Sequence, residues 1–150
     1  MHRETGTLED IWKRYLPAFL LSILLVMASM AVAGILPFGE KSLLIVDMSS
    51  EYVDYFLALR NAFFSGEGLD FWFEMSMGLT PIGLFAYYLA SPFLFLVILL
   101  PSEMILEAIY LMTILKIGSA ALTFSIFAHR GMNLRGIWPV LFGISWALIG

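Results

Sequence analysis

The chain has 150 residues, of which 61% are hydrophobic and only 13% are charged, with a formal net charge of −4. Soluble domains carry roughly 25% charged residues, so this composition excludes an ordinary soluble protein and indicates a membrane protein. The sequence has no basic face of the kind that binds nucleic acid. It also has no cysteine, which excludes a disulfide framework and a thiolate metal site.

The first long apolar block is "LPAFLLSILLVMASMAVAGIL", residues 16–36. A bilayer crossing needs about 20 predominantly apolar residues, so the block predicts a first membrane-spanning helix. A signal peptide is the alternative, but its apolar core would be shorter, and the following "PFGEKS" is not a small-residue cleavage site. We therefore expect a retained anchor.

Charge differs on the two sides of this predicted helix. The stretch 1–15 has three basic residues that flank the helix, Arg3, Lys13 and Arg14. Basic flanks are retained in the cytoplasm, so we expect a cytoplasmic N-terminus. The stretch 37–103 is rich in acidic residues and has only Lys41 and Arg60 as basic ones. We therefore expect it to form the first external loop.

Within this loop, the spacing of apolar residues predicts an amphipathic helix in "DMSSEYVDYFLALRNAFFSGEG", residues 47–68. The acids share a separate face, and Gly66 and Gly68 end the pattern. Such a helix, close to a membrane anchor, is expected to lie along the membrane surface. Residues 69–78 repeat the mixture of aromatic and acidic side chains, which suits the interfacial belt. The apolar positions of the predicted helix are Met48, Tyr52, Tyr55, Phe56, Leu59 and Phe63.

Residues 82–100 are apolar enough to cross the bilayer, but Ser91-Pro92 interrupts them. If they cross, the basic stretch "HRGMNLRG", residues 129–136, lies outside, against the tendency of basic loops to stay in the cytoplasm. If they form a broken helix that is re-entrant or lies at the outer surface, the basic stretch is cytoplasmic. Because charge favours it, we expect the broken helix, although a hydropathy window favours a span.

Two further apolar segments complete the chain. Residues 104–128 are long enough for another span, and the basic loop 129–136 follows them. Residues 137–150 are apolar and open a further span that the sequence does not complete. We therefore expect an all-α, polytopic helical membrane protein, with this chain as the N-terminal fragment of a longer one.

Three carboxylates, Asp47, Glu51 and Asp54, follow one another at steps of four and three. Asp47 could cap the predicted helix, with Glu51 and Asp54 facing water. Alternatively, Asp47 is a general base at the outer bilayer surface, because a carboxylate within hydrogen-bond reach can take a proton from an attacking hydroxyl. The pattern alone leaves both readings open.

Lys116 is the second candidate, because apolar residues surround it in "LMTILKIGSAALTF". A charge within a span is costly and is a functional hypothesis by default. A rise of about 1.5 Å per residue places Lys116 roughly 18 Å from Met104, near the middle of the bilayer. It could form a structural ion pair with a carboxylate, or bind a lipid phosphate or another substrate group.

The stretches "PFGEKSLLIVDMSSEYVDYF", "GLTPIGLFAYYLASPFLFLVILLP" and "LMTILKIGSAALTFSIF" resemble the N-terminal region of the bacterial YfhO-type membrane proteins. The resemblance runs from Pro37 to Phe127, more than half of the chain. Members of that family look like GT-C glycosyltransferases of the bacterial plasma membrane, with many spans and a polyprenyl-phosphate sugar donor. They are similar to enzymes that decorate envelope polymers such as lipoteichoic acid.

The resemblance implies roles for the candidate residues. Asp47 matches the acid expected as catalytic base, and Lys116 matches a basic residue expected near the donor phosphate. Glu51 stands where the family often has glutamine, so acceptor contacts at that position are open. Glu51 and Asp54 would shape the acceptor site or hold a divalent metal, whose requirement is unknown. The expected partners are membrane lipid, the polyprenyl-phosphate sugar donor and an envelope polymer acceptor, without nucleic acid.

Two other classes of function also fit these residues. A polytopic transporter or lipid flippase would explain the embedded Lys116 together with external acids. A non-catalytic envelope assembly factor would use the external loop as a docking surface. The fragment by itself is expected to be inactive as an enzyme.

Overall fold

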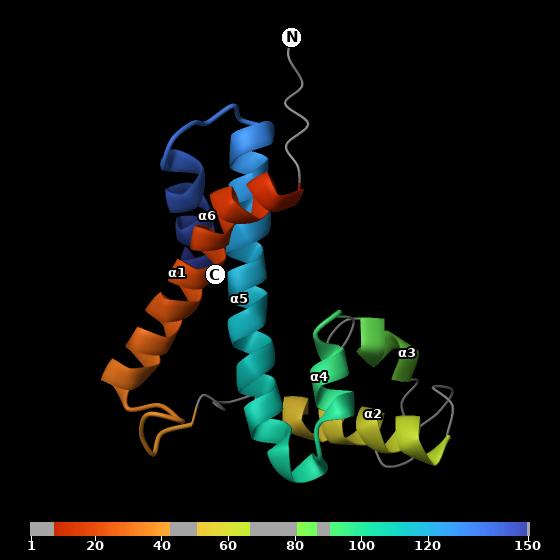
Figure 1. The fold of residues 1–150 in the computed structure, drawn as a ribbon. Helices are drawn as coiled ribbons and strands as arrows, with labels where there is room; N and C mark the ends of the chain where they lie inside the picture. Colours follow the sequence, from red (N-terminus) through yellow and green to blue (C-terminus); the bar gives the residue numbers. More distant parts are fainter. Residues whose placement is uncertain (1–7, 43–50, 67–80, 87–90, 150) are drawn as a thin grey trace. The chain divides into compact units, whose positions relative to one another are not determined.

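The structure, a computed structural model, describes residues 8–42, 51–66, 81–86 and 91–149. Within these ranges there is no strand, only an isolated bridge between Ile35 and Lys41. The predicted all-α class is therefore confirmed. The elements, in chain order in Figure 1, are α1 (Leu8–Ala33), α2 (Val53–Ser65), α3 (Pro81–Leu84), α4 (Leu94–Leu99), the short 3-10 helix η3 (Ser102–Met104), α5 (Ile105–Arg130) and α6 (Trp138–Ile149).

Two helices are long and apolar enough to cross a membrane. They cover Lys13–Ala33, within α1, and Ser102–Arg130, which joins η3 to α5. Only 17% of the apolar window of the first and 28% of that of the second is buried, whereas the core helix of a soluble protein would be mostly buried. Exposed leucines such as Leu24 and Leu25 on α1 are suited to contact lipid. Both helices therefore have the composition and the exposed surface of membrane spans.

The chain divides into two compact units. The first unit is Met1–Lys41 together with Thr113–Gly150, and the second unit is Ser42–Met112. The first contains α1, the later part of α5, and α6. The second contains α2, α3, α4 and the start of α5.

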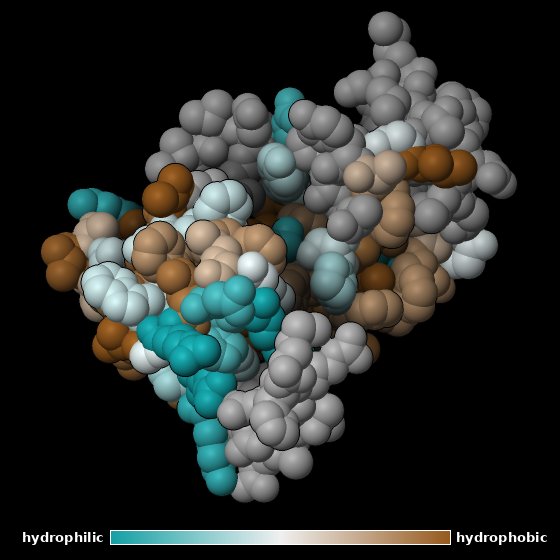
Figure 2. Space-filling model, turned by 90° about the horizontal axis from the view of Figure 1, so that it is seen from above, coloured by the Kyte–Doolittle hydropathy of each residue, from teal (hydrophilic) through white to brown (hydrophobic). Residues whose placement is uncertain are grey.

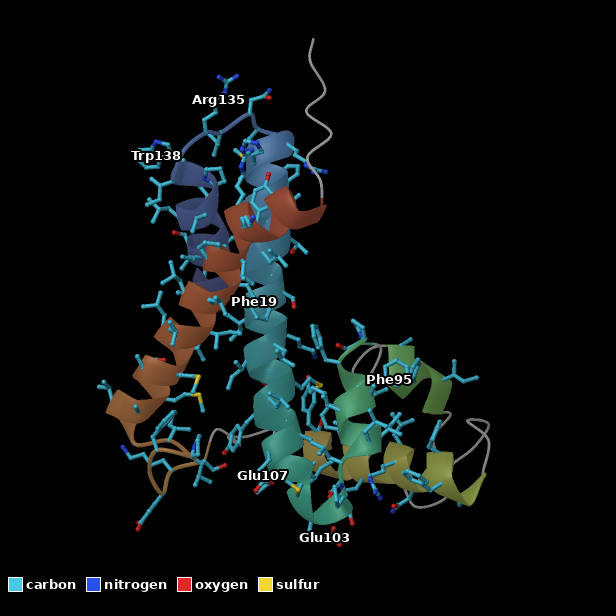
Figure 3. All side chains as sticks on the ribbon, in the orientation of Figure 1. Phe19, Phe95, Glu103, Glu107, Arg135 and Trp138 are labelled. Atoms are coloured by element: carbon cyan, nitrogen blue, oxygen red, sulfur yellow. The ribbon has the colours of Figure 1, made fainter. Side chains whose placement is uncertain are left out.

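Small residues allow close helix packing in the first unit. A Cβ added at Gly118 on α5 would lie 2.9 Å from the ring of Phe19 on α1, which Figure 3 labels between the two helices. A Cβ added at Gly143 on α6 would collide with the carbonyl oxygen of Ala121 on α5. Such small residues are common where membrane helices cross. Farther along the α5–α6 contact, Phe124 stacks on Trp146 with ring centroids 4.7 Å apart.

A hydrogen-bond network around His129 joins α1 to the end of α5. The Arg14 guanidinium lies 2.9 Å from His129 Nε2 and can only donate. Nε2 is therefore the acceptor, and His129 Nδ1 donates to the carbonyl oxygen of Leu134 at 2.8 Å. Neutral histidine protonated at Nδ1 satisfies both contacts. The network places the beginning of α1 and the end of α5 at the same end of the first unit.

Four exposed basic side chains lie at this end of the first unit. Figure 2 shows hydrophilic side chains gathered among apolar ones in the view from above, and Figure 3 labels Arg135 and Trp138 projecting outward. By contrast, acidic residues lie at the start of α5: Glu103 is in η3, just before α5, and Glu107 is in the first turn of α5. Acids near the N-terminus and bases near the C-terminus of α5 both complement the helix dipole. The exposed basic residues at the basic end are Lys13, Arg14, Arg130 and Arg135.

The second unit has a hydrophobic core formed by α2, α4 and the beginning of α5. Burying large apolar side chains is the main favourable term in such packing, about 1.5–3 kcal/mol for each fully buried one. Gly66, with φ of 75°, ends α2 in the left-handed conformation that glycine adopts most easily. The buried residues of this core are Phe56, Leu59, Ala62, Leu94, Val97, Ile105, Ala108, Ile109 and Met112.

The apolar face predicted for the loop helix is only partly buried in the protein core. Phe56 and Leu59 are buried as their spacing indicates, but Phe63 is 63% exposed and Ala62 is buried instead. Phe63 therefore stays outside the protein core, and contact of the predicted apolar face with the membrane surface stays a prediction. Met48 lies outside the described residues.

The described parts of segment 82–100 belong to two short helices. α3 and the helical turn after it end at Ala86, and α4 has six residues, which is about 9 Å of helix. Leu100 then adopts an extended backbone before Pro101. Residues 87–90 lie outside the described ranges, so the crossing or re-entry of this segment stays a prediction.

Candidate functional site

The acidic candidates lie on and before α2, in the second unit. Asp47 lies outside the described residues. Glu51 is half-buried in the helical turn that leads into α2, and Asp54 is exposed in the first turn of α2. Glu51 accepts a hydrogen bond from the hydroxyl of Tyr55. The structure therefore brings Glu51 together with a tyrosine that sequence reasoning had assigned only to the apolar face.

Electrostatics around Tyr55 favours its neutral phenol. Burial raises the pKa of Tyr55 above its usual value, and the negative charge of Glu51, the hydrogen bond to Glu51 and the charge of Asp54 raise that pKa further. Tyr55 is therefore a stable hydrogen-bond donor to the Glu51 carboxylate at neutral pH. The sequence signal for this pair was the separation of four residues, which places two side chains on one helix face.

A second tyrosine contact lies on the other side of Asp47 in the sequence. The hydroxyls of Ser42 and Tyr110 are 3.2 Å apart, although 68 residues separate them in the chain. Tyr110 is only 8% exposed and belongs to α5. Ser42 and Glu51, the described residues on either side of Asp47, thus both contact a tyrosine hydroxyl. Nothing in the local sequence indicated the role of Tyr110.

Lys116 belongs to the first unit and lies at the centre of the longer candidate span. It is 14 residues from Ser102 and 14 residues from Arg130, the two ends of that span. Its side chain is exposed on α5, and no described residue of the first unit forms an ion pair or a hydrogen bond with it. A ligand-binding role or an ion pair for Lys116 stays a prediction.

Metal ligands are sparse in the described part of the chain. No group of three or more histidine, aspartate or glutamate side chains is arranged to hold a metal among those residues. His129 uses both ring nitrogens, one for Arg14 and one for Leu134. A divalent metal, if one binds, would need Asp47 beside Glu51 and Asp54, which are the hard oxygen ligands that such ions prefer.

Comparison with known proteins identifies the family to which the chain belongs. A family profile described as "Bacterial membrane protein YfhO" matches residues 18–150, most of the chain. No curated protein and no solved structure matches the sequence. The match agrees with the membrane-spanning helices and confirms the resemblance that the sequence suggested. The chain therefore belongs to the YfhO family of bacterial membrane proteins.

Proposed function

We propose that the protein is a membrane glycosyltransferase that transfers a sugar from a polyprenyl-phosphate donor to an envelope polymer, such as lipoteichoic acid, on the external face. The observation that carries the proposal is the family match over residues 18–150, because the YfhO family resembles the GT-C glycosyltransferases. The acid-rich stretch directly after the first candidate span adds support, since that is where such enzymes carry their catalytic acid.

In this mechanism, Asp47 is the general base. The acceptor hydroxyl attacks the anomeric carbon, its proton passes to the Asp47 carboxylate, and the bond from that carbon to the lipid phosphate breaks. A base acts only when it is held within hydrogen-bond reach of the proton. Glu51 and Asp54 would contact the acceptor or hold a divalent metal.

The leaving phosphate needs a positive partner, because preorganised charge near a developing anion stabilises the transition state. Lys116 is our candidate, and its lack of a partner among the described residues of the first unit supports this role. With about 1.5 Å of rise per residue, Lys116 lies roughly 21 Å from each end of the 29-residue span. The phosphate would therefore have to enter a cavity between helices to reach it.

The hydrogen bond between Arg14 and His129 supports the topology that the mechanism requires. It joins the beginning of α1 to the end of α5, so if both helices cross, residues 34–104 begin and end on the same side. A single crossing by residues 82–100 would instead place the two ends of residues 34–104 on opposite sides of the membrane. We therefore propose that the N-terminus and residues 129–136 are cytoplasmic and that residues 37–103 are external.

A transporter or flippase is a second candidate, because an unpartnered Lys116 in a span is also expected along a substrate path. An assay distinguishes the two functions. Membranes from cells that produce the protein are supplied with a polyprenyl-phosphate donor that carries a radiolabelled sugar. Label that appears covalently on the acceptor polymer supports the glycosyltransferase. Label that crosses the membrane while still attached to the lipid, with no polymer product, supports transport and contradicts our proposal.

A further inference from the structure

Arg60 is an isolated positive charge in an acidic and apolar part of the chain. It is the only basic residue between Ser42 and Met112. It lies in the middle of α2 and is half-buried. Among the described residues, no carboxylate pairs with it. A partly buried guanidinium without an anion is unfavourable unless its donors find acceptors, so the contacts that Arg60 does make are informative.

Two contacts fix the orientation of the Arg60 guanidinium. Its Nε donates to the carbonyl oxygen of Leu100 at 3.0 Å, at the C-terminal end of α4. Its Cζ lies 4.8 Å from the ring centroid of Phe64, one turn further along α2. Together these contacts use one of the five N–H donors and one face of the guanidinium. The four donors on the two Nη atoms have no acceptor among the described residues.

Exposed apolar side chains lie on α2 and α4, the two helices that the contacts of Arg60 join. Phe63 and Phe64 are each 63% exposed and pack edge to face, with ring centroids 5.5 Å apart. On α4, Leu99 is 78% exposed and Phe95, labelled in Figure 3, is 66% exposed. An arginine stacked on an exposed aromatic ring is typical of the membrane interface, where aromatic side chains gather at the level of the headgroups and arginine extends its charge toward water.

The candidate spanning helices would hold the second unit close to the membrane. The second unit is connected at both ends to a candidate spanning helix, because α1 ends at Ala33, nine residues before Ser42, and α5 continues beyond Met112. The anion available at a lipid surface is the phosphate of the headgroup. Two N–H donors of a guanidinium match two phosphate oxygens in a bidentate pair, which lysine cannot reproduce.

We propose that Arg60, Phe63 and Phe64 form a binding site for the headgroup phosphate of a membrane phospholipid. The Nη donors of Arg60 bind the phosphate oxygens, the Leu100 carbonyl and the Phe64 ring hold the guanidinium in place, and the two rings insert beside the headgroup. The site is separate from the acidic candidates. Arg60 is nine residues after Glu51, about 13.5 Å along the helix, and half a turn away around it. The inference does not depend on the proposed enzymatic function.

A depth measurement tests the site. Because the chain has no cysteine, a nitroxide label can be attached at one chosen position. A label on Leu99→Cys measures membrane depth beside Leu100, and a label on Asn61→Cys measures membrane depth on the polar side of α2. The protein is reconstituted in phospholipid vesicles, and collision of each label with oxygen and with a water-soluble nickel chelate is measured. We expect the label at 99 to favour oxygen and the label at 61 to favour the chelate.

The variants then identify the group that binds. In phospholipid vesicles, Arg60→Gln should shift the label at 99 toward water, and Arg60→Lys should shift it less. In vesicles of glycosyl diacylglycerols, which have no phosphate, Arg60→Gln should cause no shift. Circular dichroism checks that the helices persist. If Arg60→Gln loses helicity, Arg60→Lys, which keeps the charge but not the bidentate geometry, provides the same comparison between the two lipids.

Three results would overturn the proposal. Equal shifts in phospholipid and glycolipid vesicles would mean that Arg60 only connects α2 to the end of α4. Absence of a shift in phospholipid would mean that the guanidinium binds no headgroup. A shift toward water on adding excess inorganic phosphate to the Arg60 protein would identify a soluble phosphate as the ligand in place of the lipid.

Discussion

The guanidinium of Arg14 donates a hydrogen bond of 2.9 Å to Nε2 of His129, 115 residues further along the chain. The ring of Tyr15 lies beside the same imidazole, with centroids 5.8 Å apart. This contact joins the start of the first candidate span to the end of the second. It therefore connects two segments that their hydropathy identifies only separately, as two candidate spans.

The first prediction concerns that topology. Single cysteines at Glu40, Glu103 and Met132, all exposed positions, are treated with a membrane-impermeant maleimide in intact cells. We expect Glu40→Cys and Glu103→Cys to react from outside, and Met132→Cys to react only after lysis. Because the protein has no native cysteine, it adds no background reaction. Protection of Glu103→Cys together with labelling of Glu40→Cys would mean that residues 82–100 cross, against our proposal.

The second prediction concerns the stability of the first unit. His129→Ala removes the acceptor of Arg14 and the donor to Leu134, and each hydrogen bond contributes about 1 kcal/mol. We expect a loss of about 1–2 kcal/mol in the free energy of unfolding, measured in detergent micelles with denaturant. Arg130→Ala is the matched control, since Arg130 is the next residue and is exposed. It should change stability by less than about 0.5 kcal/mol, and equal losses in both variants would refute the role of His129.

The third prediction concerns the crossing of α5 and α6. Gly143→Ala places a methyl group against the carbonyl oxygen of Ala121 and 3.0 Å from Cβ of Ser125. Overpacking of this kind costs about 1–3 kcal/mol, and a backbone atom cannot move aside as a side chain can. Thermal unfolding in micelles should therefore show a clear loss. Gly83→Ala, where an added Cβ meets nothing within 4 Å, should be nearly neutral, and a neutral Gly143→Ala would show that the helices do not approach so closely.

The fourth prediction concerns pH. The pKa of Tyr55 is raised by burial and by Glu51 and Asp54, so the folded protein holds the phenolic proton more tightly than the unfolded chain, whose tyrosines titrate at about 10. The stability from this contact is complete below pH 10 and is lost as pH rises through the folded-state pKa. The phenolate absorbance of wild type minus Tyr55→Phe should titrate above pH 10, and Glu51→Gln should lower that midpoint. A midpoint at or below 10 would contradict the contact.

Much of the fold follows from local sequence patterns. The apolar runs were enough to predict a helical membrane protein, because a span depends mainly on the length of consecutive apolar residues. The spacing of Phe56 and Leu59 predicted an apolar face on an amphipathic helix, and Gly66 and Gly68 predicted its end. These features depend on neighbours in the sequence, which is why they could be read without a structure.

Other features depend on tertiary contacts that no local pattern encodes. The contacts of Arg14 with His129 and of Ser42 with Tyr110 join residues far apart in the sequence. Phe63 shares the helical spacing of Phe56 and Leu59, but only the folded structure shows which side chains of that face enter the protein core. For the candidate site, the sequence predicted the acids and Lys116, whereas the partnership of Glu51 with Tyr55 required the folded helix.

The measurement that tests the central claim most directly is sugar transfer from a polyprenyl-phosphate donor in membranes that contain the wild-type protein, Asp47→Asn or Glu40→Gln at equal expression. Removal of a general base typically lowers the rate by a factor of roughly 10² to 10⁴. We therefore expect Asp47→Asn to lose transfer by about that factor, and Glu40→Gln, an exposed acid seven residues earlier, to retain it. Wild-type transfer by Asp47→Asn would contradict the assignment of Asp47 as the catalytic base.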